Sequence, residues 1–83
     1  MENKTVTKEQ MEEVFRYYSK TTLRYMYTQK YEKYIEPRIS ALSKWRGARA
    51  IIKQLGLYED WKKYWQKYYE ENKWKLEEPN IYI

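Results

Sequence analysis

The sequence contains no cysteine and no histidine, and it has only two glycines and two prolines. The absence of cysteine excludes disulfide bonds and thiolate-bound metal sites in this chain. The absence of histidine removes the side chain that most often acts as a general base or metal ligand near neutral pH. The two glycines, at positions 47 and 56, do not have the spacing of a phosphate-binding loop. We therefore expect that the protein is not an enzyme and uses no metal or cofactor.

Long apolar runs are also missing from the 83 residues. A helix that crosses a membrane needs about 20 apolar residues, and a signal peptide needs a shorter apolar core at its start. We therefore expect no membrane partner, and a location in the cytoplasm or in a virion assembled there. The length suits a single helical domain over residues 1–83, in which residues 77–83 form a short apolar C-terminal tail.

Aromatic residues are abundant, with eleven tyrosines and four tryptophans. A large aromatic side chain buries ~150–250 Å², so a few of them are enough for a small core. Tyrosine and tryptophan also keep a polar group, which suits positions at the rim of a core or in a protein interface. The composition predicts an aromatic core that reaches the surface.

A helix start is encoded near the N-terminus. Thr7 and Gln10 have the spacing of a capping box, in which each side chain bonds the backbone of the other residue. Neither glycine nor proline follows before Pro37. We therefore predict a long first helix from about Lys8 to about Glu36.

This first helix has two apolar faces when residues are placed at intervals of about 100°. One face carries Met11, Val14, Phe15, Tyr18, Thr22 and Tyr25. The other face, nearly opposite, carries Leu23, Tyr27, Tyr31 and Tyr34. A helix with two apolar faces needs two partners, of which the rest of the chain supplies one. We predict that Tyr27, Tyr31 and Tyr34 contact a second copy, in a homodimer or a larger assembly.

Residues 21–28 allow a second interpretation. They are rich in β-branched and aromatic residues, and their apolar side chains alternate as they do in a strand. A strand here, followed by two helices, would give a ribbon-helix-helix arrangement. The helical interpretation is preferred because no turn residue brackets the segment.

Proline and glycine predict the limits of the second helix. Pro37 suits the first helical position and Gly56 suits the position just past the end, which gives a helix from Arg38 to Leu55. A third helix follows at once and extends to about Leu76. The sequence therefore predicts an all-α, three-helix domain with a long first helix. The short turn at Gly56 is compatible with a helix-turn-helix relationship between the second and third helices.

The positive charge is concentrated in the second helix. Residues 37–56 contain five basic residues and no acidic residue, whereas the segments on either side are close to neutral. Four of these basic side chains fall within an arc of about 80°: Arg38, Arg46, Arg49 and Lys53. Arginine makes planar, bidentate contacts with phosphate and with guanine edges. The pattern predicts a phosphate-binding surface; in the alternative, acidic residues of the first or third helix neutralise it.

The third helix has an aromatic face. This face consists of Leu57, Tyr58, Trp61, Tyr64, Trp65, Tyr68 and Tyr69. We interpret it mainly as core, because few aliphatic residues are available elsewhere. A partner-protein surface, stacking on single-stranded bases and a membrane interface are the other interpretations.

Together these patterns predict a small basic nucleic-acid-binding protein, with DNA favoured over RNA as partner. It would coat, condense or regulate DNA, and a virus or mobile element is the origin that suits it. One alternative is a protein-binding inhibitor or adaptor, such as a virus-encoded blocker of a host defence nuclease. The other alternative is a structural subunit that assembles with copies of itself.

Overall fold

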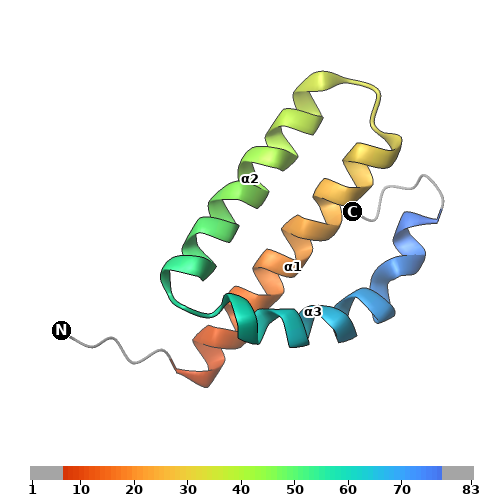
Figure 1. Ribbon diagram of the computed structural model, residues 1–83. Coiled ribbons are helices and arrows are strands. Elements are labelled where there is room, and N and C mark those ends of the chain that lie inside the picture. Colours follow the sequence, from red (N-terminus) through yellow and green to blue (C-terminus); the bar gives the residue numbers. More distant parts are fainter. Residues whose placement is uncertain (1–6, 78–83) are drawn as a thin grey trace.

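The structure is a computed structural model that describes residues 7–77. It contains three α-helices, α1 (Lys8–Tyr31), α2 (Ile35–Gln54) and α3 (Tyr58–Asn72), and a 3-10 turn, η1 (Lys73–Leu76). No strand lies within residues 7–77, so the prediction of an all-α, three-helix domain is confirmed. Helices α1 and α2 lie side by side and antiparallel, and α3 crosses the first half of α1 (Figure 1). The helix-turn-helix relationship stays a prediction, and the proposed tail lies outside the described residues except for Glu77.

Helix α1 begins with the predicted capping box. The backbone N–H of Gln10 donates to Thr7 Oγ1 at 3.1 Å, and the backbone N–H of Thr7 donates to Gln10 Oε1 at 3.0 Å. The helix ends at Tyr31, so the prediction that it extends to Glu36 is wrong. Pro37 instead lies in the first turn of α2, which begins at Ile35, so α1 must end before that turn starts. The chain therefore leaves the helix at Glu32, whose backbone is extended.

The strand interpretation of residues 21–28 is wrong, because the whole segment belongs to α1. Its threonine hydroxyls find partners within the helix. Those of Thr21 and Thr22 donate to the carbonyl of Tyr18 at 2.9 and 2.7 Å. That of Thr28 donates to the carbonyl of Tyr25 at 2.9 Å. These bonds satisfy the hydroxyls where the chain buries them, so the β-branched residues do not require a strand.

Helix α2 starts at Ile35, three residues before the predicted start. Pro37 is then the third helical residue, a position whose missing N–H has no intrahelical partner in any case. The predicted end at Gly56 is confirmed, and its φ of 72° is one that glycine adopts without strain. Gly56 N–H donates to the carbonyl of Lys53, and Leu57 N–H to that of Ile52, both at 3.0 Å. These two bonds form a Schellman motif, which reverses the chain into α3.

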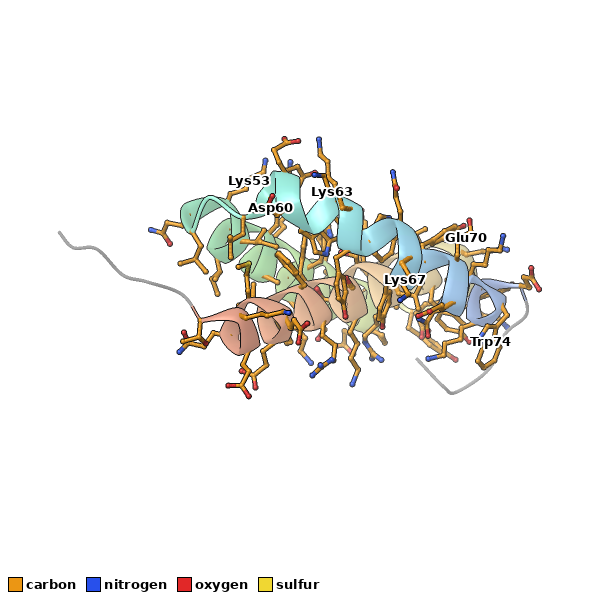
Figure 2. The ribbon with its side chains drawn as sticks, turned by 90° about the horizontal axis from the view of Figure 1, so that it is seen from below. Lys53, Asp60, Lys63, Lys67, Glu70 and Trp74 are labelled. Carbon is orange, nitrogen blue, oxygen red and sulfur yellow. The ribbon has the colours of Figure 1, made fainter. Side chains whose placement is uncertain are left out.

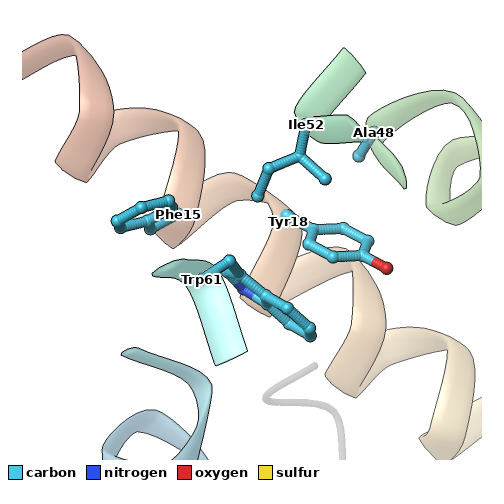
Figure 3. Close-up of a cluster of buried hydrophobic side chains, with 5 residues drawn as sticks. All are labelled: Phe15, Tyr18, Ala48, Ile52 and Trp61. Atoms are coloured by element: carbon cyan, nitrogen blue, oxygen red, sulfur yellow. The ribbon is translucent and has the colours of Figure 1, made fainter. Parts of the chain in front are cut away.

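The core lies where the three helices meet. Its buried cluster consists of Phe15, Tyr18, Ala48, Ile52 and Trp61 (Figure 3). Aromatic rings make up most of its volume, as the composition predicts. The rings of Tyr18 and Trp61 lie 4.2 Å apart between centroids. The indole N–H of Trp61 donates to Ser19 Oγ at 2.9 Å, which satisfies a polar group inside the cluster.

Both apolar faces of α1 are covered by the same chain. On the first face, Tyr25 stacks on Trp45 of α2 with a centroid distance of 4.7 Å. On the second face, Leu23 is only 2% exposed, and the hydroxyl of Tyr31 donates to the carbonyl of Leu76 in η1 at 2.7 Å. The second face therefore does not by itself require a second copy of the protein.

Candidate nucleic-acid interface

The four predicted phosphate-binding residues all belong to α2, and we call them the basic stripe: Arg38, Arg46, Arg49 and Lys53. Because α2 is a continuous helix across these positions, their spacing places them on one side of it. The stripe is about 22 Å long at 1.5 Å per residue. That length corresponds to about six nucleotides along one strand of a duplex.

Neighbouring side chains hold three members of the stripe in place. Arg38 Nη2 donates to Gln29 Oε1 at 3.3 Å, which ties this end of the stripe to α1. The guanidinium carbon of Arg49 lies 5.5 Å from the ring centroid of Trp45. Lys53 Nζ lies 5.0 Å from the ring centroid of Tyr58. These contacts orient the side chains and leave their positive charge uncompensated.

No member of the stripe forms an ion pair within residues 7–77. In this part of the chain, ion pairs join Lys62 to Glu59 at 3.3 Å and Lys73 to Glu70 at 3.0 Å. All four of these residues belong to α3 and η1. In this part of the chain, the alternative in which acidic residues of the first or third helix neutralise the stripe is therefore wrong.

The surface of α3 differs from the stripe because it mixes charges of both signs. Figure 2, which views the molecule from below, shows Lys63 and Lys67 along α3 together with Asp60 and Glu70. The aromatic face of the helix is turned inward, where Trp61 is buried and most of its aromatic neighbours are half-buried. Burial raises the pKa of Tyr68 above its usual value, and nearby Tyr64 adds to the effect. The inward position of this aromatic face agrees with its interpretation as mainly part of the core.

An apolar patch continues the stripe toward the start of α2, and sequence reasoning missed it. Ile35 is 67% exposed and Ile39 is 53% exposed. With Leu42, Arg38 and Gln29 they line a shallow hollow. Residues 35, 39 and 42 fall on the same side of the helix as the stripe, which was the available signal. The side of α2 that carries the basic charge is therefore mixed at its start, where Arg38 lies among apolar side chains.

The three tyrosines predicted to contact a second copy do not form one surface. The rings of Tyr27 and Tyr31 lie 5.0 Å apart between centroids, and Tyr31 is tied to η1 through Leu76. Tyr34 instead caps the start of α2 and is 71% exposed. Self-association through these residues stays a prediction.

The described residues also bear on two further kinds of site, a metal site and a membrane-spanning helix. Within residues 7–77, no three acidic side chains gather as ligands for a metal ion. The helices described there are too short or too polar to span a membrane. Comparison of the chain with protein-family models, curated proteins and solved structures gives no match.

Proposed function

We propose that the protein binds nucleic acid, and DNA in particular, through the basic stripe of α2. The observation that carries this proposal is the set of four cations on one side of one helix, without an ion-pair partner in residues 7–77. Each cation that meets a phosphate releases condensed counterions, and that release drives association. Cations that are already oriented lose little conformational entropy when they bind.

The stripe suits contacts with the phosphate backbone more than the reading of base sequence. Arg46 and Lys53 are exposed and reach outward, whereas Arg38 and Arg49 are half-buried and lie closer to the helix. Phosphate contacts position a protein on a duplex and carry no sequence information directly. We therefore propose a protein that coats or condenses DNA, of viral or mobile-element origin, in the cytoplasm or in a virion.

The direct test is fluorescence anisotropy of labelled duplex and single-stranded DNA, repeated across a range of salt concentrations. Four phosphate contacts predict a slope of about −3 to −4 for log affinity against log salt. The variant Arg46→Glu/Arg49→Glu removes two contacts and adds repulsion. We expect its affinity to fall by at least about tenfold and its slope to become shallower by about two.

Lys63→Glu/Lys67→Glu is the matched control, because it changes the net charge equally on the mixed surface of α3 (Figure 2). We expect a smaller loss of affinity for this control. Equal losses in the two variants would show that net charge alone governs binding and would remove the stripe from the site. Circular dichroism of both variants separates loss of binding from loss of fold.

A protein target is the second candidate, and the exposure of the apolar patch favours it. Tyr34, Ile35 and Ile39 form the most exposed run of large apolar side chains among the described residues. Such residues are more typical of a protein interface than of a phosphate site. If the wild-type protein binds no DNA at low salt, the target is a protein. In a pull-down from host extract, the variant Ile35→Ser/Ile39→Ser should then fail to capture the protein target that the wild type captures.

A further inference from the structure

The outer side of α1 carries charges that are segregated by sign along the helix. Glu9 and Glu13 lie near its start, and Lys20 and Arg24 lie further along. All four side chains are exposed and fall within an arc of about 60°. Along the lower edge of Figure 2, side chains near the start of α1 end in oxygen and those further along end in nitrogen. This row of charges on α1 thus has one acidic end and one basic end.

Each end of this row places like charges four residues apart on the helix. Residues four apart on a helix are neighbours, so Glu9 repels Glu13, and Lys20 repels Arg24. Within residues 7–77, neither acidic residue is ion-paired, and Lys20 is not ion-paired either. Helix α3, in contrast, places Lys62 three residues after Glu59 and pairs the two. An opposite charge from outside the chain would offset the repulsion between the two acidic residues at the start of α1.

The four charges are arranged so that a second α1 supplies those opposite charges. Glu13 and Lys20 lie at equal distances from the point between Arg16 and Tyr17, and so do Glu9 and Arg24. In an antiparallel pair of helices that is centred on this point, each acidic residue faces a basic residue of the other copy. A two-fold symmetric contact requires a surface that is complementary to itself in this way.

Apolar groups lie beside the centre of this row of charges on α1. Tyr17 is 53% exposed although it is a large aromatic residue. It borders a shallow apolar hollow that Val14, Ala48 and Ile51 also line, with Glu13 at the edge. Ile51 is 51% exposed. An exposed tyrosine next to an apolar hollow, with charges around it, is the usual composition of a protein interface.

We propose that a second copy of this chain packs antiparallel against the outer side of α1, with the two-fold axis close to Tyr17. Glu13 of each copy pairs with Lys20 of the other, and Glu9 lies opposite Arg24. Tyr17 and Ile51 fill the centre of the contact. This interface uses other residues than the basic stripe of α2, so it does not depend on the proposed binding of nucleic acid.

The test is a charge swap, read out as the dimer dissociation constant by sedimentation equilibrium. Glu13→Lys places two lysines against each other at both symmetric contacts, and Lys20→Glu places two glutamates there. We expect each single variant to weaken the dimer by about tenfold or more. The double variant Glu13→Lys/Lys20→Glu restores opposite charges across the interface, so its dissociation constant should return toward the wild-type value.

A second pair of variants tests the apolar centre. Ile51→Glu should weaken the dimer, whereas Ile39→Glu, at a similarly exposed isoleucine on another side of α2, should not. A wild-type dissociation constant above about 1 mM would overturn the proposal. A double variant Glu13→Lys/Lys20→Glu whose dimer is as weak as the dimers of the two single variants would also overturn it. DNA affinity at low protein concentration, measured by anisotropy, reports separately on the basic stripe.

Discussion

The hydrogen bond between Ser19 and Trp61 connects two helices at a site that water does not reach. Ser19 is fully buried, and the indole N–H of Trp61 donates to its hydroxyl at 2.9 Å. Ser19→Ala leaves the indole N–H buried without a partner, which costs about 1–3 kcal/mol. We expect urea denaturation to show that loss in the free energy of unfolding. Ser43→Ala, at an exposed position, is the control, and an equal effect in both variants would contradict this account.

Tyr18 predicts how stability changes at high pH. Burial, the largest cause, raises the pKa of its hydroxyl above 10.0, and nearby Tyr58 adds to the effect. In the unfolded chain the hydroxyl ionises near its usual value, so above it the unfolded state loses a proton that the folded state keeps. This contribution to stability is complete below about pH 10 and is lost as the pH rises through the folded value. Urea denaturation at about pH 9 and pH 11 should show a smaller decrease for Tyr18→Phe than for the wild type.

At the scale of single elements, the two glycines should respond to alanine in opposite directions. Gly56 has a φ of 72°, where a Cβ is strained, so Gly56→Ala should destabilise the protein by about 1 kcal/mol. Gly47 lies inside α2, and an added Cβ would meet no atom within 4 Å. Gly47→Ala should therefore stabilise the protein by up to about 1 kcal/mol, because alanine favours the helix. Thermal and urea denaturation of the two variants measure both effects, and shifts of the same sign would contradict the assignment.

The ends of helices could be predicted from sequence where a local hydrogen bond defines them. The capping box of Thr7 and Gln10 and the helix end at Gly56 are such cases, and both are confirmed. The end of α1 and the start of α2 were placed wrongly, because Tyr34 caps α2 without a side-chain hydrogen bond. Pro37 fits any of the first helical positions, so it could not fix the start alone.

The candidate site was predictable only in part, because helical spacing is local whereas the contacts of a side chain depend on how the helices pack. Helical spacing places the basic stripe on one side of α2 whatever the rest of the chain does. Whether acidic residues reach that stripe depends on how α1 and α3 pack, which spacing does not determine. The apolar patch at Ile35 and Ile39 was missed for the same reason, since exposure of an isoleucine follows from the placement of neighbouring helices.

At the scale of the whole molecule, the proposed dimer and the proposed DNA-binding surface have a joint consequence. Ile51 belongs to the centre of the proposed dimer contact, and on the helical wheel of α2 it lies about opposite the centre of the basic stripe. A dimer that forms through α1 therefore turns its two basic stripes away from each other. Two such stripes would hold two duplexes at once, as the proposed condensation of DNA requires.

We therefore expect the protein to bridge DNA. Immobilised duplex should capture a second, labelled duplex when the wild-type protein is present at concentrations that favour the dimer. Glu13→Lys should lose this capture but keep its anisotropy signal with a single duplex, and the double variant Glu13→Lys/Lys20→Glu should regain it. Arg46→Glu/Arg49→Glu should lose both signals, because it removes the contact with DNA itself. Capture that survives in Glu13→Lys would show that bridging does not depend on the interface of α1.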